Sequence, residues 1–289
     1  MSGRLSESEP HPATSAAHAV KPSKAAFSCT PGSVGADNGS IAPRYDTLGV
    51  GYTSVRQEDP RLAARIHAAL GGARTLLNVG AGAGAYEPAD LDVTAVEPSP
   101  IMRAQRLRGA APVVDARAEQ LPFADDSFDA AMAVLSDHHW EDHARGLAEL
   151  RRVARRRVVL FSWEPSSLSD SWLVRDYLPG FARLVPAGYS LDQALAALGG
   201  GRLEPVPIPH DCRDGFLHAY WRRPHAYLDA RVRAGISVFH LLEPGEVHDA
   251  IERLASDLDS GEWERRNGAL LDLDELDLGY RLLVAELTT

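Results

Sequence analysis

Glycines recur at every second position after a short apolar run, and a carboxylate ends the next apolar run. The glycines are Gly80, Gly82 and Gly84, and the carboxylate belongs to Glu97. Glycine lets the backbone adopt left-handed conformations and approach a ligand closely. A carboxylate at the end of the second strand can accept both hydroxyls of a ribose. This spacing predicts a nucleoside site at the carboxyl edge of a parallel sheet.

The glycine spacing alone leaves the kind of nucleoside open. A dinucleotide-binding fold has the pattern G-x-G-x-x-G and binds pyrophosphate at a helix N-terminus. Ala85 stands where its third glycine would be, and alanine can replace that glycine. An NAD-dependent dehydrogenase is therefore one hypothesis.

Two later segments favour another family. Residues 116–129, Ala-Arg-Ala-Glu-Gln-Leu-Pro-Phe-Ala-Asp-Asp-Ser-Phe-Asp, resemble the DAExLPFxDxSFD segment of class I S-adenosylmethionine-dependent methyltransferases. Residues 135–140, Leu-Ser-Asp-His-His-Trp, are similar to the xLHHxxD segment of the branch that includes ubiquinone/menaquinone C-methyltransferases and many small-molecule methyltransferases. The motifs stand in the family's order over residues 74–163. The resemblance implies a methyltransferase with S-adenosyl-L-methionine as its cofactor.

The resemblance also implies cofactor-binding positions, with two departures from the family pattern. Asn78 stands where the family usually carries Asp, and its amide could still order the loop. Arg117 stands where an Asp usually accepts from the adenine amine, which a guanidinium cannot do. The backbone of Arg117 and Ala118 could contact the ring instead, or a shifted register could use Asp115. The expected cofactor residues are Asn78, Gly80, Gly82, Gly84, Glu97, Pro98, Arg117, Ala118 and Leu135.

Candidate bases follow the fourth and fifth predicted strands, whose carboxyl ends face the methyl donor. His138 could remove a proton, since an unperturbed imidazole has a pKa of ~6.5; alternatively, it caps the next helix or packs on the sheet. Glu164 follows an apolar strand and Trp163, so its carboxyl group could be desolvated and basic. A surface loop acid is the alternative for Glu164.

The predicted acceptor site is aromatic and basic. Aromatic walls suit a flat or apolar acceptor and stabilise cations, and arginines can clamp an anionic tail. Plain core packing and a solvated basic face are the alternatives. The expected substrate-binding residues are Tyr52, His139, Trp163, Trp172, Tyr177, Arg213, Trp221, Arg222 and Arg223.

These residues support several functions. The leading hypothesis is C-methylation of a small molecule of specialised metabolism with Glu164 as base, for example an isoprenoid diphosphate whose double bond attacks the methyl group. O- or N-methylation with a His base is the enzymatic alternative. A non-catalytic S-adenosylmethionine-binding protein is a third hypothesis, and the long aromatic region after the fifth strand argues against it.

The apolar pattern predicts an α/β fold, a Rossmann-like doubly wound seven-stranded sheet with an added helical substrate cover. Strands are predicted at Thr75–Val79, Val93–Glu97, Val113–Ala116, Asp129–Leu135, Arg157–Ser162, Arg202–Ile208 and Gly279–Leu287. Helical spacing covers Pro60–Leu70, Pro100–Arg108, Glu141–Val153, Ser169–Leu178, Leu191–Leu198, His225–Val238 and Pro244–Asp259.

The domain organisation follows from composition. Residues 1–42 are rich in Ser, Ala, Pro and Gly and predict a disordered leader. Residues 43–289 form the predicted methyltransferase domain, in which 164–200 and 209–278 are expected to cover the substrate. Tyr52 lies in an aromatic segment before the first predicted helix.

Composition narrows the partners. The net charge of −10 argues against nucleic acid. No apolar stretch reaches the ~18–20 residues that span a bilayer, and no signal peptide is predicted. Two cysteines predict free thiols in a cytoplasmic protein. The expected partner is a small-molecule acceptor, anionic and apolar in the isoprenoid case. No metal ligand set is predicted, and the acceptor's identity and the oligomeric state stay open.

Overall fold

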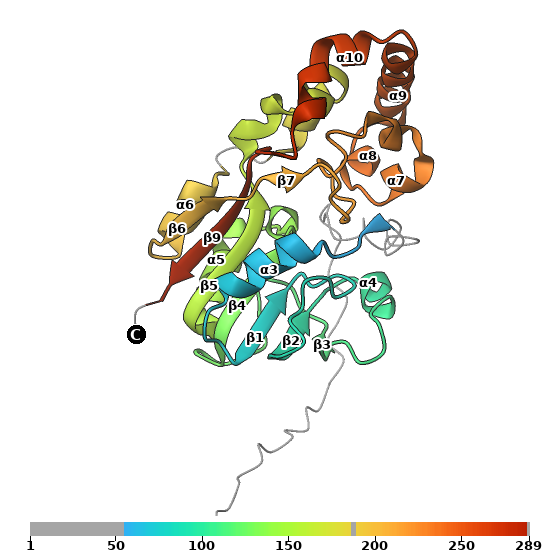
Figure 1. Ribbon diagram of the computed structural model, residues 1–289. Helices are drawn as coiled ribbons and strands as arrows, with labels where there is room; N and C mark the ends of the chain where they lie inside the picture. Colours follow the sequence, from blue (N-terminus) through green and yellow to red (C-terminus); the bar gives the residue numbers. More distant parts are fainter. Residues whose placement is uncertain (1–54, 186–188, 288–289) are drawn as a thin grey trace, which may run out of the picture. The chain divides into compact units, whose positions relative to one another are not determined.

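The computed structural model describes residues 55–185 and 189–287, which belong to one compact unit (Figure 1). The predicted leader and Tyr52 lie outside the described residues. The strands are β1 (Thr75–Val79), β2 (Asp92–Val96), β3 (Val113–Val114), β4 (Phe128–Val134), β5 (Ala154–Trp163), β6 (Arg202–Pro205), β7 (Ile208–Pro209), β8 (Glu275–Leu276) and β9 (Tyr280–Glu286). The α-helices are α3 (Pro60–Ala69), α4 (Pro100–Ala104), α5 (His143–Val153), α6 (Leu191–Ala197), α7 (Ala230–Ala234), α8 (Val238–Leu241), α9 (Pro244–Asp259) and α10 (Glu262–Asn267).

Seven strands form one sheet in the order β3-β2-β1-β4-β5-β9-β6. β1 to β5 run parallel, and β9 lies antiparallel between β5 and β6. This confirms the predicted Rossmann-like sheet. The strand order reverses between β1 and β4, and ligands of such sheets bind beyond the carboxyl ends of the strands at that point.

Each central strand is buried on both faces, because its side chains alternate between two hydrophobic clusters. Val159 and Phe161 of β5 belong to one cluster, and Val158 and Leu160 belong to the other. The first cluster joins the sheet to α3 and to the region after β5. The second joins it to α5 and α6.

Side-chain caps start the helices near the predicted residues. The Asp59 carboxylate accepts the N–H of Arg61 before α3, and the Ser99 hydroxyl accepts the N–H of Met102 before α4. The Asp142 carboxylate accepts the N–H of Arg145, so α5 begins after the predicted Glu141. Each cap satisfies an N–H that has no partner within the helix.

The connection from β1 to β2 contains turns and no helix. Its Tyr86 has a left-handed φ of 64° and is almost fully buried. The Tyr86 hydroxyl donates to Asp214 at 3.0 Å, while its N–H donates to Glu58 at 2.9 Å. One buried side chain therefore holds a short loop that no helix supports.

Several predicted elements are shorter in the structure. β3 has two residues, and the sixth strand stops at Pro205. Ile208–Pro209 pairs instead with β8 in a separate two-stranded sheet, because prolines cannot donate to a continuous ladder. The predicted helix over 225–238 divides into a 3₁₀ turn, η6 (Pro224–Leu228), followed by α7 and α8.

The region after β5 also forms short turns. Its helical turns are η3 (Pro165–Asp170), η4 (Leu173–Tyr177) and η5 (Pro179–Leu184); η2 (Asp137–His139) follows β4, and η7 (Gly268–Asp272) precedes β8. α6 packs on α5 and β6, in the cluster on the opposite face from α3. Within the predicted cover segment 164–200, α6 is thus an ordinary sheet-covering helix. Figure 1 shows α7 to α10 gathered beyond the end of β5.

No helix in the described ranges, 55–185 and 189–287, is long and apolar enough to cross a bilayer.

Candidate active site

The glycine loop and the end of β2 meet at Glu97. The Glu97 carboxylate accepts the N–H of Gly82 at 2.8 Å through Oε2 and the N–H of Ser99 at 2.8 Å through Oε1. Its side chain is buried, and this burial raises its pKa, although both N–H donors stabilise the charged form. A desolvated carboxylate held in this way can accept hydroxyl hydrogen bonds from a ribose.

The glycine loop needs glycine for two reasons. Gly80, Gly82 and Gly84 all have left-handed φ values, of 69°, 53° and 98°. A Cβ on Gly80 would also lie 2.6 Å from Cβ of Ser136. The loop therefore exposes backbone at the carboxyl end of β1, as an approach to a nucleoside requires. The residues around Glu97 fit S-adenosylmethionine.

Asn78 is buried and takes part in a polar chain below the loop. Its Nδ2 donates to Glu87 Oε1 at 3.1 Å, and Glu87 forms a buried ion pair with Arg106 at 2.7 Å. The family's Asp at this position would place a second carboxylate beside Glu87. The Asn78 amide instead donates a hydrogen bond to Glu87, so no repulsion between carboxylates arises here.

The other expected cofactor residues frame the same edge. Arg117 pairs with Glu141 at 2.6 Å, so its guanidinium is committed to an ion pair near the surface. Ala118 is buried beside it, and Pro98 is exposed. Leu135 has a left-handed φ of 50° and donates its N–H to Phe161 at 2.7 Å. Asp115, the alternative adenine partner, is exposed and pairs with Arg103.

The rings of His138 and His139 lie side by side in the turn after β4, with centroids 3.9 Å apart and planes tilted by 50°. The His138 ring also lies 6.0 Å from the ring of Trp163 at the end of β5. Nδ1 of His138 is buried, and no described residue forms a hydrogen bond with it. The nearest acid is Asp137, whose Oδ1 lies 4.0 Å from that nitrogen.

Asp137 is a buried carboxylate that the sequence analysis did not single out. It accepts hydrogen bonds from Ser162 at 2.7 Å, from His143 at 3.2 Å and from Tyr189. Burial opposes its charge, but the hydrogen bond from His143 and the nearness of His138 outweigh it and lower the pKa of Asp137 to about 2.

Burial favours the neutral forms of the His138 and His139 imidazoles. Burial lowers the pKa of His138, and the negative charge of Asp137 only partly opposes this shift. Burial lowers the pKa of His139 further. A neutral imidazole next to a buried carboxylate can accept a proton and be stabilised as a cation.

Glu164 occupies a different position from the one expected of a free base. Its Oε2 accepts the N–H of Leu191 at 3.0 Å, at the start of α6. Its backbone N–H donates to Gly279 at 2.8 Å. The structure therefore uses Glu164 to join the end of β5 to a helix N-terminus, where a carboxylate is stabilised.

Most of the aromatic residues expected to line the acceptor are in the core of the region after β5. Trp172 donates its indole N–H to the carbonyl of Trp221 at 2.8 Å, and Trp221 donates its own to Ile208 at 3.0 Å. Tyr177 donates to Asp257 at 2.7 Å. All three rings are buried, so the structure places them in the core of this region rather than on an open acceptor wall. Trp163 is only partly buried beside His138.

Two of the three arginines expected to clamp an anionic acceptor bind backbone carbonyls in the structure. Arg222 donates to the carbonyl of Leu273 at 2.8 Å, and Arg223 donates to the carbonyls of Cys212 and Ala219. These guanidinium groups therefore hold loops together. Arg213 is exposed, on the segment between β7 and η6.

Arg56 is a residue that the sequence analysis missed. Its Nε donates to Asp214 Oδ1 at 2.6 Å, and the Arg56 side chain is only 16% exposed. Its positive charge contributes to the lowered pKa values of His138 and His139, and it opposes part of the rise that burial causes in the pKa of Tyr280. Its charge therefore acts on both imidazoles of the turn after β4, although nothing in its sequence surroundings marks it.

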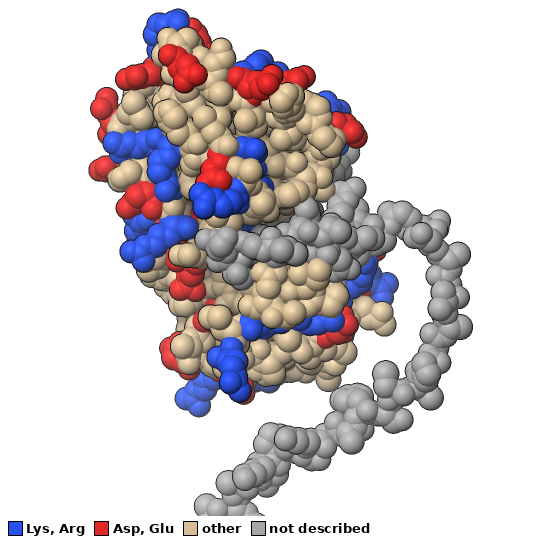
Figure 2. Space-filling model, turned by 90° about the vertical axis from the view of Figure 1, so that its right-hand side faces the viewer, with Lys and Arg blue, Asp and Glu red and all other residues tan. Residues whose placement is uncertain are grey.

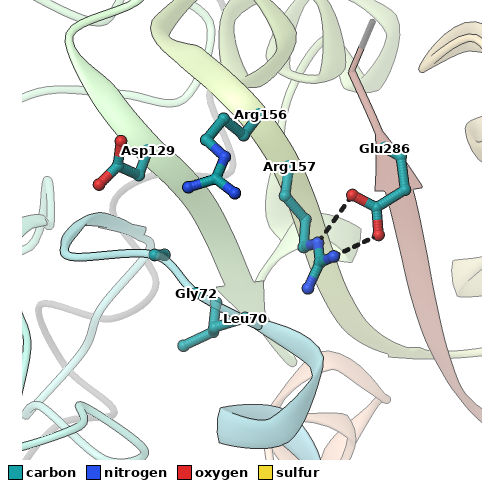
Figure 3. Close-up of a pocket in the computed structure, with 7 residues that line it drawn as sticks. Leu70, Gly72, Asp129, Arg156, Arg157 and Glu286 are labelled. Atoms are coloured by element: carbon teal, nitrogen blue, oxygen red, sulfur yellow. Dashed lines mark hydrogen bonds and ion pairs between the residues drawn. The ribbon is translucent and has the colours of Figure 1, made fainter.

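The small cavity in Figure 3 lies at the opposite edge of the sheet. Asp129, Arg156 and Arg157 line it near the starts of β4 and β5, and Glu286 lines it at the end of β9. Arg157 donates to Glu286 at 3.0 Å. The cavity's volume of about 30 Å³ leaves room for a water molecule rather than a nucleoside.

Charge and metal ligands add two observations. On the face drawn in Figure 2, outside the grey residues, basic and acidic side chains are interspersed rather than separated by sign. Among the residues that the structure describes, no group of three or more His, Cys, Asp or Glu is arranged to hold a metal ion.

Comparison with known proteins identifies similar chains. A family model described as a methyltransferase domain matches residues 77–162. The crystal structure of a putative methyltransferase from an antibiotic biosynthesis pathway of Anabaena variabilis has 33% sequence identity and a TM-score of 0.75. That match covers 81% of this chain and 99% of the other.

Two curated proteins match over shorter stretches. The ubiquinone/menaquinone biosynthesis C-methyltransferase UbiE of Citrifermentans bemidjiense is 29% identical over 147 residues, which is 45% of this chain and 63% of that protein. An uncharacterised methyltransferase of Mycobacterium tuberculosis is 41% identical over 90 residues, 29% of this chain and 36% of that protein. This chain thus spans less than two thirds of these curated relatives.

Proposed function

We propose that this chain, which belongs to the class I S-adenosylmethionine-dependent methyltransferases, methylates an oxygen or nitrogen atom of a small molecule and uses His138 as its base. The family fixes S-adenosylmethionine as the cofactor. The acceptor atom and the base are the proposed parts.

The cofactor supplies an electrophilic methyl group when bound. Glu97 would accept the ribose hydroxyls, and the backbone of Gly80 and Gly82 would lie along the ribose and the methionine portion. These residues orient the methyl group toward the turn after β4, where His138 stands. Positioning of this kind is the main contribution of a protein to a displacement reaction.

The observation that supports His138 is its relation to Asp137. The two side chains lie 4.0 Å apart, Nδ1 to Oδ1, and Asp137 is held by three hydrogen bonds. This arrangement favours a proton on Nδ1 and a lone pair on Nε2. Because 21% of the His138 side chain is exposed, Nε2 can face the acceptor and take its proton.

Carbon methylation with Glu164 as base is the second candidate. Its support is the likeness to a relative named a C-methyltransferase, 29% identical over 147 residues. The contact between Glu164 and the N–H of Leu191 weighs against a free base. An isoprenoid diphosphate is one acceptor to test for this candidate. Arg222 and Arg223, which were expected to bind the diphosphate, bind backbone carbonyls instead.

A methyl-transfer assay with radiolabelled S-adenosylmethionine separates the two candidates. Phenols, aliphatic alcohols, amines and isoprenoid diphosphates form the acceptor panel, and mass spectrometry locates the added methyl group. His138→Gln should lower kcat by roughly 10²–10⁴, the usual effect of losing a general base, and Glu164→Gln should retain activity. A carbon-methylated product with the opposite pattern would replace the His138 proposal with the Glu164 one.

A further inference from the structure

Another buried imidazole, that of His218, lies against the ring of Tyr280 in β9. His218 is 3% exposed and sits between β7 and η6. Its Nδ1 lies 3.2 Å from the hydroxyl of Tyr280, and no described residue bonds to its Nε2. Buried polar atoms without partners are rare in proteins and need an explanation.

The register of β5 and β9 places His218 relative to the base. Tyr280 is directly opposite Trp163 in the antiparallel pair, so their side chains share one face. The ring of Trp163 lies 6.0 Å from that of His138, and the ring of Tyr280 lies 5.7 Å from that of His218. We call His138, Trp163, Tyr280 and His218 the aromatic row.

The aromatic row runs away from the cofactor. In the sheet, β1 carries the glycine loop, and β4, β5 and β9 follow in that order. The residues of the row stand at the carboxyl ends of β4 and β5 and at the start of β9, which is the same edge.

The hydrogen bond with Tyr280 assigns the tautomer of His218. If the Tyr280 hydroxyl donates to Nδ1, only the N–H at Nε2 is left without a partner. If Nδ1 donated instead, both the hydroxyl hydrogen and the lone pair on Nε2 would lack partners. The first arrangement leaves fewer groups unsatisfied, so His218 presents a donor at Nε2.

Other buried nitrogens without partners are less informative. Arg106 donates through both of its Nη atoms, and Arg223 donates through one of them. Trp263 packs against Trp172, within the region after β5. His218 differs because its ring neighbour Tyr280 stands opposite Trp163 in the sheet, and the Trp163 ring lies 6.0 Å from that of His138.

We infer that His218, positioned by Tyr280, anchors the far end of the acceptor by donating a hydrogen bond from Nε2 to an oxygen atom. The acceptor class is then a flat, largely apolar molecule that carries the methylated atom near His138 and a carbonyl or ether oxygen near His218. This inference rests on the proposed function for the position of the reacting end. The anchor itself is a binding contact and needs no methyl transfer.

Two fragments that differ by one oxygen test the anchor. Acetophenone carries a carbonyl oxygen on an apolar ring, and ethylbenzene has nearly the same shape without it. Each is added to the full-length protein, labelled with ¹⁵N-histidine and saturated with S-adenosylhomocysteine, while long-range ¹H–¹⁵N spectra report the ring nitrogens. Acetophenone should shift the Nε2 resonance of His218, and ethylbenzene should not. Equal shifts, or none with either fragment, overturn the inference.

A pair of substitutions separates the two ring nitrogens. His218→Asn keeps an amide near the position of Nδ1 and removes Nε2, whereas His218→Gln keeps a donor near Nε2. Acetophenone affinity should fall about tenfold in His218→Asn, the effect of about one hydrogen bond, and stay within about threefold in His218→Gln. Unchanged affinity in a folded His218→Asn protein contradicts the anchor.

The fragment measurements distinguish this inference from the proposed function. His138→Gln should lower kcat for methyl transfer by roughly 10²–10⁴ without changing the shift of His218 Nε2 by acetophenone. If the shift occurs but His138→Gln remains fully active, the anchor stands and the base is wrong. If His138→Gln is inactive and no shift occurs, the base stands and the anchor is wrong.

Discussion

The Glu97 carboxylate accepts the backbone N–H of Gly82 at 2.8 Å, across 15 residues of sequence. This contact fixes the glycine loop against the end of β2 before any ligand arrives. A ribose bound there would therefore meet a carboxylate that is already oriented.

Substitution of Glu97 by Ala tests this site. The variant loses the ribose hydrogen bonds, and a hydrogen bond to a charged group contributes roughly 1.5–3 kcal/mol. We expect the Kd for S-adenosylhomocysteine, measured by calorimetry, to rise at least about tenfold. Glu252→Gln, at an exposed carboxylate on α9, is the control and should bind normally. Unaltered affinity in a folded Glu97→Ala protein would show that Glu97 does not bind the ribose.

Substitution of Gly80 by Ala tests the loop geometry. The new Cβ meets Ser136 at 2.6 Å in a backbone with a left-handed φ of 69°. We expect a loss of roughly 1–3 kcal/mol in stability from strain, together with weaker S-adenosylhomocysteine binding. Gly72→Ala is the control, because its Cβ would meet no atom within 4 Å. Equal melting temperatures and affinities for the two variants would show that the loop adapts freely.

The pH dependence of methyl transfer tests the pair of His138 and Asp137. Because burial lowers the pKa of His138, kcat/KM should rise with pH to a plateau. The midpoint of this rise should lie below 6.5, the ordinary pKa of histidine. The negative charge of Asp137 raises that pKa, so Asp137→Asn should move the midpoint to lower pH and reduce the plateau. Tyr189→Phe removes one hydrogen bond to Asp137 but keeps its charge, and should leave the midpoint near the wild-type value. If Asp137→Asn leaves the midpoint unchanged, the charge of Asp137 does not act on the base.

The Tyr86 hydroxyl is expected to stabilise the connection between β1 and β2. Tyr86→Phe leaves Asp214 with one donor fewer, which should lower the free energy of unfolding by roughly 1.5–3 kcal/mol. Urea unfolding measures the change. Tyr220→Phe serves as control, because the Tyr220 hydroxyl has no hydrogen bond with the described residues. A Tyr86→Phe protein as stable as this control would mean that packing alone holds the loop.

The sequence by itself determined the parts of this protein that depend on local pattern. The short apolar runs between Thr75 and Ser162 alternate with helical patterns, so they predict a parallel sheet whichever residues pack on it. Glycine and an acid at strand ends have few alternative uses, and they predict the nucleoside site at Gly80 and Glu97. The same reasoning reaches His138, because it follows a buried strand at that edge.

Tertiary structure decided which polar and aromatic side chains remain available for chemistry. Trp172, Trp221 and Arg223 have the composition of an acceptor site, but long-range contacts bind them to backbone carbonyls. Arg56 and His218 stand in unremarkable sequence, and only the pairing of Arg56 with Asp214 and of His218 with Tyr280 marks them as candidates for the proposed site. Sequence pattern records the face of an element and its ends, whereas hydrogen-bond partners distant in the chain depend on how the loops fold.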